Sequence, residues 1–371
     1  MRKLKIMTVV GTRPEIIKLS ETIKLCDEVF DHVLVHTGQN YDYELNQVFF
    51  EDLGLREPDY YLGVAGADLG ETMGNVLSKS YGLMAEVKPD ALLILGDTNS
   101  CLCAISAKRL KIPIFHMEAG NRCFDENLPE EVNRRIVDTT SDVNLCYSEH
   151  ARRNLMAMGC DPARTFVVGS PMREVLKANC ESVESSNVLE REGLEPKGYI
   201  LLSAHREENI DNEENFSQMV AAVDALAEEY NVPVLYSMHP RAKNRIKQRN
   251  TKFHTLVRSH KPFGFHDYIA LQQHAFCVVS DSGTLAEESA ILGFPAVSLR
   301  TSTERQEVVD KGVLSLGFIS AEGLLQAVAT EVTLCGRESA VPDYADECVS
   351  VKVAKLIQGF TGYVNKWVWG K

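Results

Sequence analysis

Carboxylate side chains follow short apolar runs in the first half of the sequence, where they could transfer protons. Asp97 comes directly after the run Ala91–Leu95, and Glu118 follows the next such run. Glu130 and Glu131 come a few residues later. If the fold brings these groups together, they raise one another's pKa and can act as acid or base near neutral pH. A structural reading is equally open, because Asp caps helices and Glu is favoured in the first turn of a helix.

Two cations near the N-terminus accompany a loop that could bind an anion. The stretch Gly11–Glu15 follows the apolar run Lys5–Val10 and contains Arg13, and Lys18 comes shortly after it. Its glycine allows close backbone approach, and its proline suits the first turn of a helix. The N–H groups at the start of that helix would form a phosphate site together with the two cations. The alternative is a capped turn with surface cations, because the motif is neither a dinucleotide-binding fingerprint nor a P-loop.

The second half of the sequence carries further groups suited to a nucleotide. His205 follows an apolar run, and a histidine at a strand end suits a phosphate or a leaving group. Ser282 and Gly283 could offer backbone N–H groups to a diphosphate, and Glu287 or Glu288 could bind ribose hydroxyls. Arg305 adds a cation. The sequence contains neither a metal-binding triad nor a G-x-S-x-G motif. These residues therefore predict nucleotide or sugar-nucleotide chemistry without specifying the reaction.

Short β-branched runs alternate with amphipathic stretches along the whole chain, which predicts an α/β fold. Strands separated by helices form parallel sheets covered by helices on both faces. The pattern restarts after residue 170, so we predict two Rossmann-like domains facing a cleft. The expected N-terminal domain covers residues 1–169, and the nucleotide-binding C-terminal domain covers residues 170–354. Residues 355–371 are expected to form a helix that can pack on the first domain.

The composition is that of a globular protein and argues against several classes of function. Of 371 residues, 44% are hydrophobic and 25% are charged, which is enough apolar material for two cores. A net charge of −13 without a basic patch argues against nucleic acid as a partner. No run approaches the roughly 18 apolar residues of a membrane helix, and no signal peptide begins the sequence, so we expect a cytoplasmic protein without a membrane partner. The ten cysteines lack metal-ligand or redox spacing and are interpreted as reduced thiols.

Taken in order, these motifs resemble those of the non-hydrolysing UDP-N-acetylglucosamine 2-epimerase family. The resemblance spans almost the whole chain, and it is specific because many motifs occur in register. The matching segments are Gly11–Glu15 with Lys18, His36–Gln39, Gly96–Thr98, His116–Gly120, Pro129–Glu131 with Asn133–Arg134, His205–Arg206, Asp281–Gly283 with Glu287–Glu288, and Thr303–Arg305.

The resemblance implies a GT-B-like fold with the nucleotide held mainly by the C-terminal domain. It also implies a reaction in which UDP leaves by anti elimination with the proton of sugar carbon 2. A glycal forms, is protonated on its other face, and takes UDP back. The reaction needs no cofactor and no metal ion, and members of the family are usually homodimers.

The resemblance further assigns roles to individual side chains. The resemblance implies that three carboxylates transfer protons and that a lysine lies close to them. It also implies a catalytic histidine that contacts the diphosphate. The implied catalytic residues are Asp97, Glu118, Glu130, Lys18 and His205. The implied substrate-binding residues are Arg13, His205, Ser282, Gly283 and Arg305 for the diphosphate and Glu288 for the ribose.

Two segments resemble one subgroup of this family. Asn40–Leu45 and Lys261–Phe265 are similar to segments of enzymes that convert UDP-2-acetamido-2,6-dideoxy-L-talose to UDP-N-acetyl-L-fucosamine for capsule or lipopolysaccharide O-antigen. The alternative within the family is conversion of UDP-GlcNAc to UDP-ManNAc. Gly66–Leu69 departs from the pattern of bacterial members that bind a second, activating substrate molecule, which leaves such activation open.

Other reaction classes would use the same UDP-binding loops. A hydrolysing epimerase would lose the intermediate to water, which the sequence does not exclude. A GT-B glycosyltransferase would need an acceptor site and has no need of three carboxylates around carbon 2. A binding protein without enzymatic activity would tolerate their loss, and all three are present.

Overall fold

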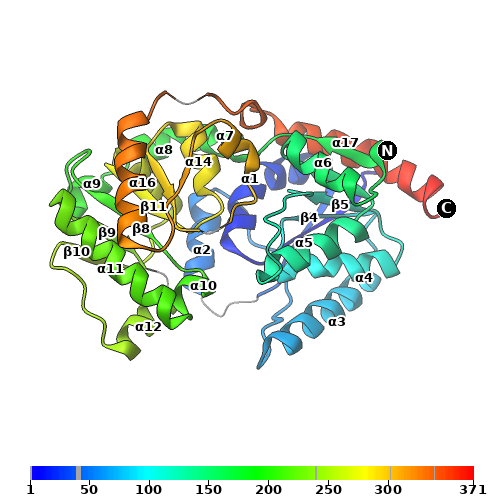
Figure 1. Ribbon diagram of the computed structural model, residues 1–371. Coiled ribbons are helices and arrows are strands. Elements are labelled where there is room, and N and C mark those ends of the chain that lie inside the picture. The colour runs from blue at the N-terminus through cyan, green and yellow to red at the C-terminus, as the bar shows by residue number, and fades with distance from the viewer. Residues whose placement is uncertain (1, 39–42, 239, 301, 338) are drawn as a thin grey trace. The chain divides into compact units, whose positions relative to one another are not determined.

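The computed structural model describes residues 2–38, 43–238, 240–300, 302–337 and 339–371. The chain divides into two compact units, of which the first comprises Met1–Ala178 with Pro342–Lys371 and the second Asn179–Val341. In the described part of each unit the strands form one parallel sheet with helices on its faces (Figure 1). The motif residue Gln39 and the subgroup residues Asn40–Asp42 lie outside the described residues.

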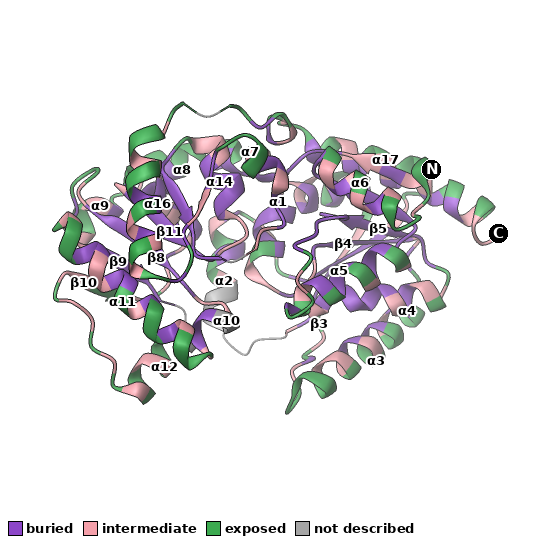
Figure 2. Ribbon diagram, in the orientation of Figure 1, coloured by how far each residue is buried: buried purple, intermediate pink, exposed green. Residues whose placement is uncertain are grey.

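The first unit is built on a sheet with the strand order β3-β2-β1-β4-β5-β6-β7, in which all neighbours are parallel. Its central strands are aliphatic and buried, as parallel strands covered on both faces must be (Figure 2). The strands are β1 (Lys5–Val10), β2 (Asp31–His36), β3 (Tyr60–Tyr61), β4 (Ala91–Leu95), β5 (Ile114–Met117), β6 (Val143–Cys146) and β7 (Thr165–Val167). The helices are α1 (Arg13–Val29), α2 (Tyr43–Asp52), α3 (Leu69–Val87), α4 (Cys103–Arg109), α5 (Pro129–Thr140), α6 (Glu149–Ala157), α7 (Met172–Ala178) and α17 (Val349–Trp367), with short 3-10 turns at Asn99–Leu102, Pro162–Arg164 and Pro342–Tyr344.

Helices cover both faces of this sheet because the strand order reverses between β1 and β4. Right-handed crossovers on the two sides of such a reversal place their helices on opposite faces. Accordingly α1 packs with α17 on one face, and α3 packs with α4 on the other (Figure 1). The buried residues of α17, such as Val353, Ile357 and Val364, recur three to four or seven positions apart, which is the spacing of one apolar stripe.

The second unit has the strand order β10-β9-β8-β11-β12-β13, again with parallel neighbours. Its core lies between this sheet and helices such as α11 and α16. The strands are β8 (Ile200–Ser203), β9 (Val234–Ser237), β10 (Val257–His260), β11 (Cys277–Ser280), β12 (Ala296–Ser298) and β13 (Ser315–Leu316). The helices are α8 (Cys180–Glu184), α9 (Val188–Glu192), α10 (Glu207–Ile210), α11 (Glu213–Tyr230), α12 (Pro240–Arg249), α13 (Phe265–His274), α14 (Leu285–Leu292), α15 (Gln306–Asp310) and α16 (Ala321–Leu334).

The two parallel sheets confirm the predicted fold class, while the division of the chain differs from the expected one. The first unit extends through α7, because α7 packs against α1. The chain rejoins the first unit at Pro342 rather than near residue 355, and Ser350 then donates its backbone N–H to Glu174 of α7 at 2.9 Å. The partners of these contacts are distant in sequence, and helix periodicity alone does not indicate them.

Each sheet has one reversal point, and the loops that follow the strands at that point are the usual place for ligands in such folds. In the first unit these loops follow β1 and β4 and contain Gly11–Thr12 and Gly96–Thr98. In the second unit they follow β8 and β11 and contain Ala204–Arg206 and Asp281–Thr284. The motifs found in the sequence therefore fall on the loops where an α/β protein places its ligands.

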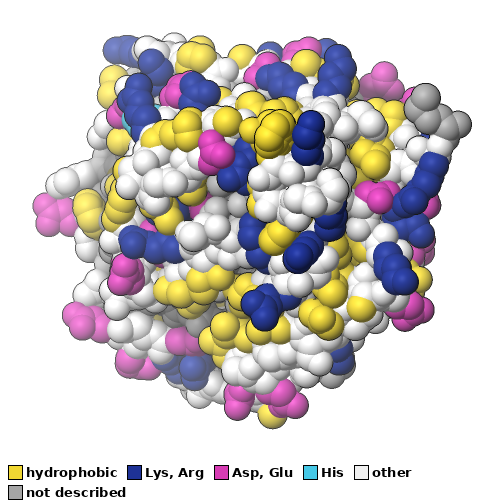
Figure 3. Space-filling model, turned by 90° about the vertical axis from the view of Figure 1, so that its right-hand side faces the viewer, with side chains coloured by type: hydrophobic (Ala, Val, Ile, Leu, Met, Phe, Trp, Pro, Cys, Tyr) yellow, Lys and Arg dark blue, Asp and Glu magenta, His cyan; other side chains and the backbone are white. Residues whose placement is uncertain are grey.

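No helix in the described parts of the chain is long and apolar enough to cross a bilayer. On the face shown in Figure 3, basic side chains stand singly or in small groups among apolar ones, and acidic side chains lie around them.

Candidate active site

Glu118 forms a buried ion pair with Lys18 at the carboxyl end of the first sheet. Glu118 follows β5 and has a left-handed backbone with φ of 65°. Its Oε2 lies 2.7 Å from Lys18 Nζ, and both side chains are almost fully buried. Asn121 Nδ2 donates to its other oxygen at 3.3 Å. This pair places a potential base next to a group that can supply a proton.

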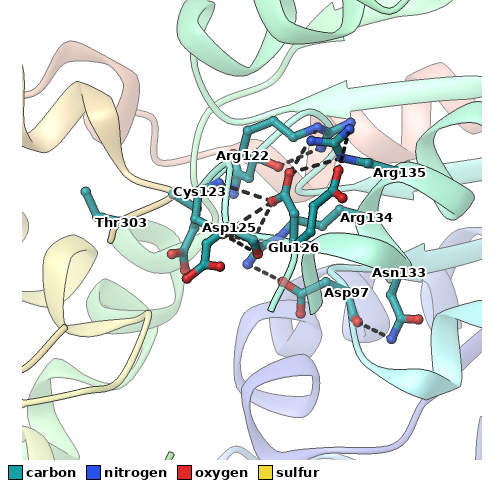
Figure 4. Close-up of polar contacts among 12 residues, drawn as sticks. Asp97, Arg122, Cys123, Asp125, Glu126, Asn133, Arg134, Arg135 and Thr303 are labelled. Atoms are coloured by element: carbon teal, nitrogen blue, oxygen red, sulfur yellow. Dashed lines mark hydrogen bonds and ion pairs between the residues drawn. The ribbon is translucent and has the colours of Figure 1, made fainter. Parts of the chain in front are cut away.

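Asp97 follows β4 and is held by the helix α5. Arg134 Nη2 lies 2.5 Å from Asp97 Oδ2, and Asn133 Nδ2 donates to the Asp97 carbonyl at 2.9 Å (Figure 4). The Asp97 side chain is 18% exposed, so it is fixed but reachable. Because α5 positions both the side chain and the backbone of Asp97, the orientation of this carboxylate depends on α5.

Glu130 and Glu131 differ sharply although they are adjacent in the first turn of α5. Glu131 is fully buried and lies 3.3 Å from Arg134 Nη1 and 3.4 Å from Arg135 Nε. Glu130 is half-buried, and no hydrogen bond or ion pair joins its side chain to another described residue. Of the two, Glu131 is held by arginines in the interior, and Glu130 is the more accessible carboxylate.

A second layer of charged residues lies beneath these groups. His116 of β5 has its Nε2 2.8 Å from the Gly96 carbonyl and its Nδ1 2.9 Å from Asp138 Oδ1. Asp138 also lies 2.6 Å from Arg122 Nη2 and accepts the Gly120 N–H at 3.2 Å. These contacts support the loops on either side of Asp97 and Glu118. The sequence pointed to His116 only as part of a motif, and it gave no sign of the roles of Asp138 and Arg122, because their partners are distant in sequence.

The loop after β1 places Arg13 in the first turn of α1. The Glu15 side chain accepts the backbone N–H groups of Gly11 and Thr12 at 2.8 and 2.7 Å, which fixes the start of the helix. Arg13 is half-buried, and its guanidinium carbon lies 5.5 Å from the centre of the Phe49 ring. A cation stacked in this way keeps a defined position near the helix N-terminus, which suits an anion.

In the second unit, Asp281 fixes His205. Asp281 follows β11, is fully buried, and its Oδ2 accepts the backbone N–H groups of His205 and Arg206, both at 2.9 Å. Its Oδ1 lies 3.1 Å from His205 Nδ1. Burial would raise the pKa of Asp281, but the His205 ring and these N–H groups outweigh it and hold the pKa well below the ordinary value. The carboxylate therefore orients the imidazole, whose side chain is 32% exposed.

Ser282 and Gly283 lie just before α14. The Ser282 hydroxyl lies 3.0 Å from the hydroxyl of Thr284, which caps the helix. A Cβ at Gly283 would stand 2.9 Å from Glu304 Oε1, so glycine permits a close approach to the backbone here. This loop and the N-terminus of α14 form a turn of the kind that binds phosphate groups.

The other two predicted nucleotide-binding residues are both buried and both paired. Arg305 Nη2 lies 2.9 Å from Glu287 Oε2. Gln272 Nε2 donates to Glu288 Oε2 at 2.6 Å. Glu287 and Gln272 were not singled out as partners from the sequence, and they show how Arg305 and Glu288 are held rigid.

The predicted residues thus fall into two sets, one in each unit. The first set comprises Arg13, Lys18, Asp97, Glu118 and Glu130, and the second comprises His205, Ser282, Gly283, Glu288 and Arg305. Among the residues that the structure describes, no group of three His, Cys, Asp or Glu side chains could hold a metal ion. The arrangement offers acid and base groups in the first unit and anion-binding groups in the second.

Comparison with known proteins gives consistent matches over nearly the whole chain. A model of the family described as UDP-N-acetylglucosamine 2-epimerase matches residues 24–358. A structure of UDP-N-acetylglucosamine 2-epimerase from Rickettsia bellii is 44% identical with a TM-score of 0.92, and each chain is covered completely. A structure of Methanocaldococcus jannaschii UDP-GlcNAc 2-epimerase in complex with UDP-GlcNAc and UDP is 32% identical with a TM-score of 0.91, covering 96% of this chain and 99% of that one.

A relative with a different substrate is similar over a comparable length. UDP-2,3-diacetamido-2,3-dideoxy-D-glucuronate 2-epimerase from Pseudomonas aeruginosa is 33% identical over 335 residues, which cover 89% of this chain and 92% of that protein. Proteins named for epimerisation at carbon 2 of different UDP-sugars are thus similar to this chain over comparable lengths.

Proposed function

This chain belongs to the UDP-N-acetylglucosamine 2-epimerase family and is an epimerase of UDP-sugars, and we propose on that premise that it inverts carbon 2 of a UDP-N-acetyl-hexosamine without hydrolysing it. The buried ion pair between Lys18 of α1 and Glu118 of the loop after β5 carries the proposal, because β5 is the neighbour of β4, which Asp97 follows. Proton transfer at an unactivated carbon needs such fixed acid and base groups.

The proposed reaction has two halves that balance. In the first, a base takes the proton from carbon 2, its bonding electrons form the double bond between carbons 1 and 2, and the bond from carbon 1 to the UDP oxygen breaks. UDP leaves with that electron pair, and a glycal remains. In the second half an acid protonates carbon 2 on the opposite face, and UDP returns to carbon 1. The carbon 2 proton is not acidic, because no carbonyl adjoins it, so departure of UDP must accompany its removal.

We assign proton transfer to the carboxylates of the first unit. Glu118, Asp97 and Glu130 act as acid and base on the two faces of the sugar, and Lys18 holds Glu118 in position through their ion pair. The different partners of the three carboxylates support the assignment, because groups in different environments can hold protons differently at one pH. The partner of Asp97 is Arg134, that of Glu118 is an ammonium, and Glu130 has no polar partner among the described residues.

We assign nucleotide binding mainly to the second unit. The diphosphate is bound by Ser282 and Gly283 at the start of α14 and by Arg305, and the ribose by Glu288. His205, oriented by Asp281, stabilises the charge that develops on departing UDP. Arg13 of the first unit contributes a further cation to the diphosphate. The proposed chemistry uses neither a cofactor nor a metal ion.

For the substrate we propose UDP-2-acetamido-2,6-dideoxy-L-talose, which gives UDP-N-acetyl-L-fucosamine for capsule or O-antigen polysaccharide. Its support is the resemblance of two sequence segments, of which Lys261–Phe265 lies in the described residues before α13. UDP-GlcNAc, giving UDP-ManNAc, is the second candidate, supported by the names of the Rickettsia and Methanocaldococcus relatives. Both sugars would undergo the same reaction at carbon 2.

Proton NMR in D2O with each substrate in turn tests both levels of the proposal. We expect a second epimer to appear with deuterium at carbon 2 while the sugar nucleotide stays intact at equilibrium. The substrate with the larger kcat/KM identifies the physiological sugar. Faster turnover of UDP-GlcNAc would contradict the L-talose assignment but leave the reaction intact. Absence of exchange with either sugar, or steady accumulation of free UDP, would contradict the reaction itself.

We further propose that the enzyme acts in the cytoplasm as a homodimer. Sugar nucleotides are made and consumed in that compartment, and the resemblance supports the dimer. Light scattering coupled to size-exclusion chromatography should give twice the mass of the 41.3 kDa chain. A mass equal to that of one chain would contradict the dimer.

A further inference from the structure

The carboxylate of Glu15 joins two loops of the first unit. Glu15 lies in the first turn of α1 and is almost fully buried. Its Oε2 accepts the backbone N–H groups of Gly11 and Thr12 at 2.8 and 2.7 Å. Its Oε1 accepts the hydroxyls of Thr98 and Ser100 at 2.9 and 2.6 Å. One side chain thus fastens the loop after β1 to the loop after β4.

Both loops carry residues assigned to the reaction. Arg13 directly follows Thr12, and Asp97 directly precedes Thr98. The strands β1 and β4 are neighbours at the reversal point of the sheet, so Glu15 lies where the two loops diverge. The Arg134 contact fixes the end of the Asp97 side chain, whereas Glu15 fixes the backbone turn that follows it.

The hydrogen bonds rather than a counter-charge hold Glu15 in place. Among the described residues it forms no ion pair, and burial raises its pKa while the surrounding donors oppose that rise. An unpaired buried carboxylate is costly to keep. Such a cost is tolerated where the group makes contacts that an apolar residue cannot make. Here the carboxylate accepts from two backbone N–H groups, two hydroxyls and, at 3.7 Å, the Cys101 thiol.

We propose that Glu15 is a positioning residue for the reaction: it sets the Asp97 loop relative to the Arg13 loop, and it neither transfers a proton nor contacts the substrate. The inference rests on the proposed function for its kinetic assay. It goes beyond that function because it gives a positioning role to Glu15, a buried motif residue that has no part in the proposed reaction.

We call the hydrogen bonds of Glu15 to the Gly11 and Thr12 N–H groups and to the Thr98 and Ser100 hydroxyls the clamp. Its two sides differ in their chemistry, which makes the proposal testable. The backbone N–H groups on one side can only donate, but the two hydroxyls on the other side can donate or accept. In Glu15→Gln the amide oxygen can take the place of Oε2, and the amide NH2 can donate to the hydroxyls in place of Oε1. The clamp therefore survives the loss of charge. In Glu15→Met the size is kept but both sides of the clamp are lost.

The experiment compares kcat, the dissociation constant of UDP, and amide hydrogen exchange in these two variants. We expect Glu15→Met to lose about 100-fold in kcat, because small displacements of reacting groups carry such costs. UDP binding should weaken far less than kcat falls, because Arg13 is the one assigned nucleotide-binding residue in these loops. Exchange in residues 11–13 and 96–102 should accelerate. Glu15→Gln should retain kcat within about tenfold and keep its protection, because its amide can satisfy the same donors.

Glu174→Met is the matched control. Glu174 of α7 also accepts a backbone N–H and a hydroxyl, both from Ser350, but it lies away from the loops that carry the assigned residues. We expect it to lower stability without changing kcat. If Glu15→Met is too unstable to study, the double variant Thr98→Val with Ser100→Ala removes the hydroxyl side alone, and we expect it to lose kcat with normal UDP binding.

Three results would overturn the proposal. Glu15→Gln as inactive as Glu15→Met would mean that the charge, not the clamp, is needed. Glu15→Met with the kcat of the Glu174→Met control would mean that the clamp does not matter for the reaction. Unchanged exchange in residues 96–102 of Glu15→Met would mean that no clamp exists. If the wild-type protein epimerises no UDP-sugar, the proposed function fails, and the hydrogen-exchange comparison still decides whether Glu15 holds the two loops.

Discussion

At the scale of single residues, the three carboxylates proposed for proton transfer differ from their neighbours in what they contact. Glu131 and Asp138 are fully buried among arginines and support loops. Asp97, Glu118 and Glu130 retain either exposure or a partner that could exchange protons. Burial and pairing therefore distinguish the carboxylates that support loops from those proposed for proton transfer. The sequence alone does not distinguish them.

Amide substitution of these three residues should abolish turnover and spare binding. We expect Asp97→Asn, Glu118→Gln and Glu130→Gln each to lower kcat by roughly 100-fold or more, because each removes a general acid or base. UDP should bind each variant as it binds the wild type in calorimetric titration. Glu126→Gln, an exposed carboxylate next to Arg135, is the control and should keep full activity. Wild-type kcat in all three variants would refute the assignment.

Asp281 gives a prediction about pH. Its pKa is lowered in the folded protein, so its ionised form stabilises the fold above its ordinary pKa, and this contribution is lost as the pH falls towards the lower folded value. Asp281→Asn removes that contribution. The difference in melting temperature between wild type and variant should therefore be larger at pH 7 than at pH 3. A difference that grows towards pH 3 would contradict the lowered pKa.

The sequence indicated the loops that follow the strands as candidate sites, because polar and charged residues there directly follow apolar runs. It singled out Lys18 and Glu118 separately, and only the resemblance placed them close together. It did not indicate that Arg134 holds Asp97 or that Glu287 holds Arg305, because such pairs depend on which strands are neighbours. The reversal of strand order between β1 and β4 brings Glu15 to Thr98, and no local pattern contains that order.

At the scale of elements, a glycine after β5 sets the path of the Glu118 loop. Gly120 has φ of 85°, and a Cβ there would lie 2.3 Å from the Ala151 carbonyl oxygen of α6. The loop can thus lie flat on α6 only with glycine at this position. The left-handed backbone of Glu118 two residues earlier belongs to the same turn, so the position of the carboxylate depends on this contact.

Alanine substitution at two glycines separates backbone strain from this contact. Gly159 has a similar φ of 81°, but a Cβ there would meet nothing within 4 Å. Both Gly120→Ala and Gly159→Ala should lose about 1 kcal/mol from backbone strain, and Gly120→Ala should lose at least about 1–3 kcal/mol more from overpacking. Urea unfolding measures both. We expect kcat to fall only in Gly120→Ala, and equal stability and activity in the two variants would contradict the argument.

The alternation of strand and helix patterns in the sequence predicted the fold class. It did not indicate where the chain leaves and rejoins the first unit. Strand and helix runs of ordinary length predicted two parallel sheets, and the structure confirms them. The place where the chain returns to the first unit depends on contacts such as Ser350 with Glu174 and on the packing of α17 against α1. These are long-range contacts, and helix periodicity does not specify them.

At the scale of the whole molecule, binding of UDP should stabilise the protein through the residues of the second unit. A ligand that binds only the folded protein, at a free concentration 100 times its dissociation constant, adds about 2.7 kcal/mol to the free energy of unfolding. We expect UDP to raise the melting temperature of the wild type and of the three carboxylate variants alike. Ser282→Pro removes the Ser282 backbone N–H in the loop before α14, which donates to the Ser280 hydroxyl at 3.0 Å, and should lose most of the shift. A full shift in that variant would place UDP elsewhere.

In the proposed reaction UDP leaves carbon 1 and returns. Positional isotope exchange tests it most directly, with substrate that carries 18O in the bond between carbon 1 and the diphosphate. While UDP is free of the sugar, rotation of its terminal phosphate mixes the label with unlabelled oxygens, which phosphorus NMR resolves. The account predicts that the label scrambles as the epimer forms and as deuterium enters carbon 2 from D2O. Epimer formed with deuterium at carbon 2 but with the label still in its original bond would contradict the account.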